Sequence, residues 1–224
     1  CGPCSEIHLD RTPHQEKTSL AENEERYLEV WNLVFIEYNK HEDGSMSPLE
    51  QKGVDTGMGL ERLCTVMQNV DSVFATDVFT PLLSQIEAIT GITFEHAPDE
   101  QKTAFRVIAD HVRSTSLAIA DGCMPSNEGR GYVLRKIIRR AALYAQNLGN
   151  THVLPQLAPY FIDQMEHIYE ELQTNRSLIL SLLRKETERF AKTLEHGRQK
   201  LFAFMEQTQG TTITGEQAFT LYDT

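Results

Sequence analysis

The spacing of apolar residues changes near residue 70 of the chain. Before that point apolar and polar positions alternate, as is typical of strands, and the longest such run is Tyr27 to Asn39. Its branched and aromatic residues predict a central strand, on which Val30, Asn32 and Val34 share one face. The following Lys40 to Lys52 stretch is predicted to be a hairpin-type loop.

Beyond residue 70 apolar residues recur every three or four positions, a spacing that predicts helices. The predicted helices are Phe74 to Thr90, Glu100 to Ala120, Tyr132 to Leu148, Leu157 to Leu172 and Arg176 to Met205. Glycines separate several of them, and the last helix is predicted to be a solvated arm packed on one side. A strand-rich beginning followed by an all-helical part predicts an α+β protein with two domains.

Composition limits the function classes. The 224 residues are 40% hydrophobic, so the chain can bury a core. A net charge of -11 excludes binding of nucleic acid over the whole surface, so such contact requires a local basic island. The sequence contains no membrane-length apolar run, no signal-peptide pattern and no disulfide framework among its four cysteines, so we expect a cytoplasmic protein. The chain lacks an initial methionine and stops within a predicted helix, so we expect an internal piece of a longer protein.

Cys1 and Cys4 have the spacing of half a zinc knuckle, with His8 nearby. A second Cys/His pair at knuckle spacing is missing from the sequence, so a tight loop leading into a short strand, Glu6 to Leu9, is favoured over a metal site. The polar stretch from Asp10 to Arg26 is predicted to be a solvated loop.

The stretch from Val54 to Leu63 predicts a glycine turn, at Gly57 and Gly59, that leads into a helix. A helix N-terminus attracts anions, and Arg62 is a permanently charged fork suited to phosphate. Asp55, just before the turn, is suited to an amino group or a hydroxyl. The alternative is that the glycines serve only packing.

Asn32 is the one amide in the central predicted strand's apolar run. Such a side chain either ties down the backbone or, next to an anion-binding turn, contacts a substrate. Glu29, which has the opposite parity along the strand, is a weaker candidate.

A basic island occupies the helix that begins near residue 130, in a window without Asp or Glu from Gly129 to Ile162. Its members are Arg130, Arg135, Lys136, Arg139 and Arg140. A solvated helix face is the alternative, but cations of one sign on an otherwise acidic chain favour nucleic-acid contact. On the preceding helix, Arg106, Asp110, His111 and Arg113 are expected to extend this face.

The run from Val54 to Leu63 resembles the third signature motif of class II aminoacyl-tRNA synthetases, and its spelling is similar to that of the alanyl-tRNA synthetases. Four other stretches agree in order with this resemblance. They are Gly2 to Ile7, Glu29 to Phe35, Met124 to Tyr132 with its arginine-rich tail, and Leu221 to Thr224.

The resemblance implies that residues 1–70 are the last part of an antiparallel-sheet catalytic domain and that residues 71–224 are a helical tRNA-recognition domain, truncated at its end. It implies a ligase of protein biosynthesis that activates L-alanine with ATP and transfers it to the 3′ end of alanine tRNA. The family's other catalytic motifs are expected before Cys1, so the fragment alone is expected to be inactive. Its oligomerisation region and its zinc-binding editing domain are expected after Thr224.

The resemblance also implies residue roles. Asn32, Asp55 and Arg62 are catalytic. Alanine is contacted by Val30, Asn32, Asp55 and Gly57, and ATP, with Mg²⁺ shared between its phosphates, by Gly57, Gly59 and Arg62.

For tRNA, the resemblance implies that Asn127 and Asp223 flank the guanine–uracil wobble pair of the acceptor stem, whose exocyclic guanine amine is a minor-groove donor. The basic residues of the island place the RNA backbone. The rival hypothesis is a non-catalytic, RNA-binding helical module that carries a synthetase remnant.

Overall fold

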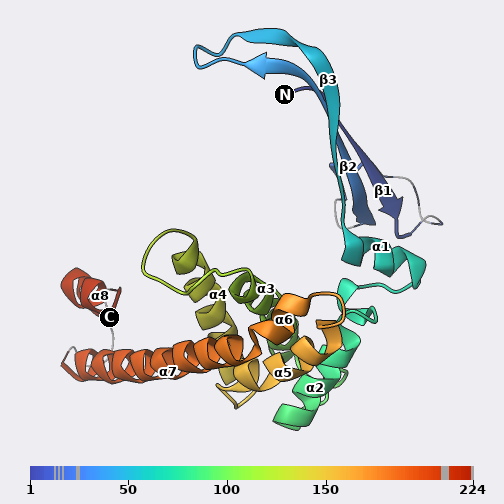
Figure 1. Cartoon of the computed structure of the whole chain (residues 1–224). Helices are drawn as coiled ribbons and strands as arrows, with labels where there is room; N and C mark the ends of the chain where they lie inside the picture. Colours follow the sequence, from blue (N-terminus) through green and yellow to red (C-terminus); the bar gives the residue numbers. More distant parts are fainter. Residues whose placement is uncertain (13, 15, 17, 24–25, 208–211, 223–224) are drawn as a thin grey trace. The chain divides into compact units, whose positions relative to one another are not determined.

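A computed structural model of the chain describes all residues except 13, 15, 17, 24–25, 208–211 and 223–224 (Figure 1). The chain divides into two compact units, residues 1–80 and 81–224. The first unit contains β1 (Cys4–Asp10), β2 (Tyr27–Lys40), β3 (Met46–Met58), α1 (Leu60–Met67) and the 3₁₀ helix η2 (Val73–Ala75). From the boundary onward the elements are α2 (Thr80–Thr90), α3 (Asp99–Ala120), α4 (Gly129–Gln146), α5 (Val153–Met165), α6 (Glu170–Thr174), α7 (Arg176–Gln207) and α8 (Gly215–Tyr222).

The three strands form an antiparallel sheet in the order β1-β2-β3, so β2 is central as predicted. The predicted tight loop at Cys1–Cys4 is wrong, because these residues run extended beside β2. The Phe35 amide donates to the Pro3 carbonyl at 2.9 Å. A Cβ on Gly2 would lie 1.6 Å from the Phe35 oxygen, so only glycine fits this close approach.

The predicted loop between β2 and β3 is too long. The turn is confined to His41–Ser45, closed by a 2.9 Å bond from the His41 amide to the Ser45 carbonyl, and Gly44 has a φ of 84°. Strand β3 therefore begins at Met46. Its pairing with β2 is interrupted once, between Ile36 and Tyr38 of β2.

The sheet is thinly covered within its own unit. Every residue of β2 from Tyr27 to Glu37 is half-buried, and Ile7 of β1 and Val54 of β3 are 51% and 56% exposed. Because a single sheet layer buries little without a second layer, the tightly packed apolar residues of the described chain lie outside the strands.

The polar segment between β1 and β2 was predicted to be a solvated loop. In the structure a buried guanidinium closes this segment, so it is not simply solvated. Arg26 donates from Nε and Nη2 to the two carboxylate oxygens of Asp10, at 2.7 and 2.8 Å. It also donates to the carbonyl of Glu16 at 2.6 Å. Charge-assisted bonds of this bidentate kind fix the segment's ends against the sheet.

The helical unit packs around α3, which contacts α4, α5, α6 and α7, and α7 in turn contacts α4 and α5. Its largest fully buried side chains are Leu82, Ile86, Phe105, Ile108, Ile119, Ile138, Leu154, Leu157, Phe161, Ile162, Leu172 and Ile179. The predicted helices are confirmed with two differences, since the first divides into η2 and α2 and the fourth into α5 and α6. Glycines at 91, 122 and 149 follow α2, α3 and α4 with positive φ, as helix-ending glycines do.

Helix α7 is the longest element of the described chain (Figure 1). One side of its first half is buried, with Ile179 and Leu183 at 0% exposure and Glu186 and Thr187 at 8% and 1%, while Ser177, Arg184 and Lys185 are exposed. After Thr187, none of the residues that the structure describes in α7 is fully buried. The prediction of a solvated arm packed on one side therefore divides between the halves: the first half is packed on one side, and the second half is largely solvated.

Candidate functional site

Strand register places three expected site residues on one face of the sheet. Asn32 lies opposite Gly57, and Val34 lies opposite Asp55. Directly opposed residues of an antiparallel pair point to the same face, so Asn32, Asp55 and Gly57 share a face. Asp55 lies two residue pairs further along the strands than Asn32, as its diagonal neighbour about 7–8 Å away.

The amide of Asn32 is oriented by β1. Its Nδ2 donates to Glu6 Oε1 at 3.2 Å and lies 3.3 Å from Cys4 Sγ. Glu6 Oε2 in turn lies 2.9 Å from His8 Nε2. Asn32 is therefore held from the neighbouring strand rather than by local backbone.

Val30 contacts the start of α1 through its backbone in this structure. The pairing of β1 and β2 shifts here, from Ile7 opposite Trp31 to His8 opposite Glu29, which leaves Val30 without a partner on β1. The Val30 carbonyl instead accepts a 3.2 Å bond from the amide of Gly59. This bulge ties the central strand to the start of α1.

The predicted turn at Gly57 and Gly59 is wrong. Gly57 lies within β3, and α1 begins at Leu60, so the strand passes into the helix through Gly59 alone. Gly59 has an ordinary φ of -73°. What these positions provide is space: a Cβ on Gly57 meets nothing within 4 Å, whereas one on Gly59 would lie 3.2 Å from Cδ of Arg62.

Arg62 lies over Gly59 and bonds to β2. Its Nη1 donates to the Glu29 carbonyl at 2.9 Å and lies 3.0 Å from Glu29 Oε2. Both side chains are partly open to solvent, at 46% and 36% exposure. The bulge at Val30 reverses the parity of β2, so Glu29 joins the polar face from which the alternation had excluded it.

These groups line a cavity of about 640 Å³ in the first unit, formed by Glu6, His8, Leu20, Ala21, Tyr27, Leu28, Glu29 and Arg62. Sequence reasoning missed Glu6 as a site residue and treated His8 only as a zinc candidate. The alternating polar residues of β1 were the available signal. Asp55 lines a separate cavity of about 370 Å³, with Lys52 among its neighbours.

The basic island on α4 is divided by packing. Arg130, Lys136 and Arg140 are exposed. Lys136 lies 5.4 Å from the Tyr132 ring centroid and the Arg140 guanidinium 5.8 Å from that of Tyr144, so two cations lie between two aromatic rings along one ridge. Cations stacked on rings remain available to an anion while their side chains are ordered.

Arg135 was predicted to contact RNA, and this prediction is corrected because the residue is only 8% exposed. It pairs with Glu186 of α7 and donates to Asn127, which lies in the loop before α4. Arg139 is half-buried, with its guanidinium 5.5 Å from the ring centroid of Phe190 on α7. The helical periodicity that puts these two residues on one ridge also turns that ridge toward α7.

On α3, Asp110 Oδ2 lies 2.9 Å from His111 Nδ1. This hydrogen bond lowers the pKa of Asp110, and the charges of His111, Arg113 and Arg140 lower it further against the opposing effect of burial. Asp110 is therefore held as a carboxylate near Arg140 of α4. Arg106 lies with its guanidinium 5.8 Å from the ring centroid of Phe94.

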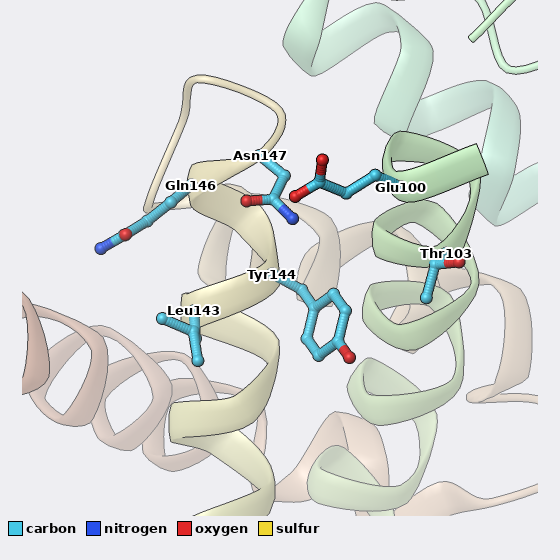
Figure 2. A pocket seen from close by; sticks show the side chains of 6 residues that line it. All are labelled: Glu100, Thr103, Leu143, Tyr144, Gln146 and Asn147. Atoms are coloured by element: carbon cyan, nitrogen blue, oxygen red, sulfur yellow. The ribbon is translucent and has the colours of Figure 1, made fainter. Parts of the chain in front are cut away.

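A second pocket, of about 480 Å³, opens between the beginning of α3 and the end of α4. Figure 2 shows Glu100 and Asn147 pointing toward each other across it, with the ring of Tyr144 below. Its remaining lining residues are Thr103, Leu143 and Gln146. Because this lining contains a carboxylate and no cation, it does not suit a phosphate.

The expected site residue Asp223 lies outside the described residues. Within the described part of the chain, no group of three or more His, Cys, Asp or Glu side chains is placed to hold a metal ion. The helices that the structure describes include none with the length and hydropathy to cross a membrane.

Comparison with known proteins places these features in a family. The sequence model of the family described as tRNA synthetases class II (A) matches residues 1–224. Relatives named alanine–tRNA ligase are 46% identical in Chlorobium luteolum and 44% identical in Christiangramia forsetii, each over 100% of this chain and 26% of the relative's length. A relative from Saccharomyces cerevisiae, named alanine–tRNA ligase, mitochondrial, is 45% identical over 100% of this chain and 24% of its own length. The chain thus spans about a quarter of the length of these relatives.

Proposed function

Because this chain belongs to the family of class II (A) tRNA synthetases, we propose that it is part of an alanine–tRNA ligase. Residues 1–70 then contribute to the adenylation domain, and residues 71–224 to tRNA recognition. The observation that carries the proposal is the shared sheet face of Asn32, Asp55 and Gly57, next to an arginine folded over a glycine at the start of α1.

In the proposed reaction the alanine carboxylate attacks the α-phosphorus of ATP, pyrophosphate leaves, and the alanyl group then moves to the terminal ribose of tRNA. A protein accelerates such steps chiefly by positioning and by charge stabilisation. Asp55 is exposed in the described chain and binds the alanine ammonium. Asn32, oriented by Glu6, fixes the substrate's direction, and the open space over Gly57 admits it.

Arg62 and Gly59 serve ATP. The guanidinium contacts Glu29 through Nη1, and among the described residues its Nη2 has no hydrogen-bond partner, so these donors can meet phosphate, whose geometry the planar fork matches. Mg²⁺ would arrive bound to the ATP phosphates and would neutralise part of their negative charge. The described residues do not form a group of donors around one metal position, so we propose no protein ligand for Mg²⁺.

In the helical unit, the exposed Arg130, Lys136 and Arg140 contact the backbone of the alanine-tRNA acceptor stem. Asn127 and Asp223 read its wobble pair. Three expectations stay predictions: zinc binding by an editing domain, an oligomerisation region and a cytoplasmic location. One relative is named as mitochondrial, so the family is not restricted to the cytoplasm.

The proposed function is tested by measuring alanine-dependent pyrophosphate exchange. The sample is a protein that contains this chain and is as long as the relatives. Asp55→Ala should weaken alanine use by about 1.5–3 kcal/mol, because the bound ammonium loses its charged partner, and should change ATP use far less. Asp43→Ala, which removes an exposed carboxylate in the β2–β3 turn, is the matched control and should leave exchange intact. Unchanged alanine kinetics in Asp55→Ala would make that residue structural.

The same assay separates the rival hypothesis of a non-catalytic RNA-binding module, since such a protein binds tRNA without exchange. The intact Asp55, Gly57, Gly59 and Arg62 favour the ligase. The assay also tests the prediction that the 224-residue chain alone is inactive.

A further inference from the structure

Asn127 is connected to α7 through a buried arginine. Arg135 Nη1 donates to Asn127 Oδ1, and Arg135 Nη2 donates to Glu186 Oε1 at 3.2 Å. Arg135 Nε also lies 3.2 Å from Glu186 Oε2, as an ion-pair contact without hydrogen-bond geometry. Both charged side chains are 10% exposed, so the pair is shielded from water, whereas Asn127 is exposed.

The donor chemistry of Arg135 decides how the Asn127 amide is turned. A guanidinium only donates hydrogen bonds, so the amide must present its oxygen to it. The amide nitrogen then points away from Arg135, and no hydrogen bond from it is recorded among the described residues. Asn127 consequently offers solvent a hydrogen-bond donor.

The loop that carries Asn127 is itself closely packed. The Ser126 amide donates to the Gly131 carbonyl at 3.1 Å, and the Ser126 hydroxyl donates to the Glu128 carbonyl at 2.8 Å. A Cβ on Gly131 would lie 2.3 Å from both the Met124 carbonyl oxygen and the Ser126 hydroxyl, so this turn requires glycine. The backbone is thus fixed on one side of Asn127 and the amide on the other.

We propose that Arg135 and Glu186 are positioning residues that hold Asn127 with its Nδ2 donor directed at an acceptor in the minor groove of the tRNA acceptor stem. This inference rests on the proposed function, in which Asn127 reads the stem. It also reverses the role expected for the amide, because the oxygen that was to accept from the guanine amine is occupied by Arg135. The matching RNA groups are a pyrimidine O2, a purine N3 or a ribose 2′-hydroxyl.

A role in stability alone does not account for the pair. Burying two charges carries a desolvation cost, and apolar residues of similar volume often fill such a site without destabilising the fold. One helical turn further along both helices, the same α4–α7 contact is made without a second buried charge pair, by Arg139 stacked on Phe190. What the Glu186–Arg135 pair adds is a fixed donor fork aimed at Asn127, which reduces the ordering that RNA binding requires.

The experiment measures aminoacylation of two acceptor-stem RNAs that differ only in a wobble or a Watson–Crick pair, with the relatives-length protein containing this chain. The double variant Arg135→Met/Glu186→Met replaces the ion pair by apolar side chains, so that the fold is kept while Asn127 is released. Asn127→Asp keeps an oxygen for Arg135 but replaces the outward donor by an acceptor. Phe190→Leu weakens the same helix contact without touching Asn127 and is the matched control.

We expect the ratio of kcat/KM values for the two stems to fall roughly tenfold in both the double variant and Asn127→Asp, which corresponds to removal of one well-placed hydrogen bond to a base. The Phe190→Leu variant should keep the wild-type ratio. Phe190→Leu should also retain alanine-dependent pyrophosphate exchange, and a cooperative thermal transition identifies each variant that is folded.

An unchanged ratio in the folded double variant overturns the positioning role. A wild-type ratio in Asn127→Asp overturns the donor assignment, because an acceptor then suffices. If the wild-type protein catalyses no alanine-dependent exchange, the proposed function itself fails and this inference fails with it.

Discussion

Arg62 and Glu29 form a contact that joins the beginning of α1 to the central strand. Nη1 of Arg62 lies 3.0 Å from the Glu29 carboxylate and 2.9 Å from the carbonyl of the same residue. A double contact of this kind limits where the guanidinium can point. The arginine proposed to meet ATP is thus already directed before any ligand is bound, and its path over Gly59 leaves little room for a larger residue, whose Cβ would lie 3.2 Å from Arg62 Cδ.

Gly59→Ala should therefore impair ATP use. The new Cβ would lie 3.2 Å from Arg62 Cδ, so the guanidinium must shift, and a misplaced phosphate contact lowers kcat/KM for ATP by roughly ten- to a hundredfold. Pyrophosphate exchange at varied ATP concentration measures this. Gly53→Ala, in β3 with nothing within 4 Å of its added Cβ, is the matched control. Equal ATP kinetics in both variants would show that the position of Arg62 is unimportant.

Arg135→Ala should destabilise the helical unit rather than simply weaken RNA binding. The change leaves the Glu186 carboxylate buried without its partner, at a cost of about 3–5 kcal/mol. Denaturant unfolding followed by circular dichroism measures the decrease in stability. Arg130→Ala, which removes an exposed cation of the same helix, should stay within about 0.5 kcal/mol of wild type. A stable Arg135→Ala variant contradicts the burial of the pair.

The exposed cations of α4 should determine how strongly salt affects tRNA binding. Replacing Arg130, Lys136 or Arg140 by alanine should reduce the slope of log K against log salt by about one for each phosphate that the variant no longer neutralises. Affinity for wobble and Watson–Crick stems should fall alike, since binding to phosphates carries no sequence information. Filter binding across a salt series tests this, with Lys52→Ala in the sheet unit as control. A slope equal to wild type in all three variants would exclude this ridge from the interface.

Asp110 should make stability depend on pH at the acidic end. The hydrogen bond from His111, followed by the charges of His111, Arg113 and Arg140, lowers the pKa of this carboxyl in the folded state. A lowered folded-state pKa means that the stabilisation is present above the unfolded-state pKa, about 3.9, and disappears as the pH falls through the folded-state pKa. Asp110→Asn should therefore be less stable than wild type at neutral pH. The two proteins should converge in thermal midpoint as the pH falls through the folded-state pKa of Asp110, and a pH-independent difference would contradict this origin.

Local spacing along the chain was sufficient for β2 and the long helices, but not for β3, most of which was predicted as loop and turn. The three- and four-residue apolar period predicted α3, α4 and α7 within a few residues, and alternation predicted β2. Parity placed Asn32 on one strand face, and residue identity marked Asp55 and Arg62 as groups for an ammonium and a phosphate. The predictions of elements and strand face succeed because helix and strand periods are properties of neighbouring residues, whereas the roles of Asp55 and Arg62 stay predictions.

The tertiary structure decided what depends on partners distant in sequence. A bulge at Val30, visible only from the register of β1 on β2, reverses parity and brings Glu29 to Arg62. Gly57 lies in a strand rather than a turn because it pairs with Asn32, 25 positions earlier in the sequence. Arg135 has the same local pattern as the exposed cations of α4, yet it is buried because Glu186, 51 residues away, supplies its counter-charge. Burial of a charge is set by such a partner, and no local pattern records it.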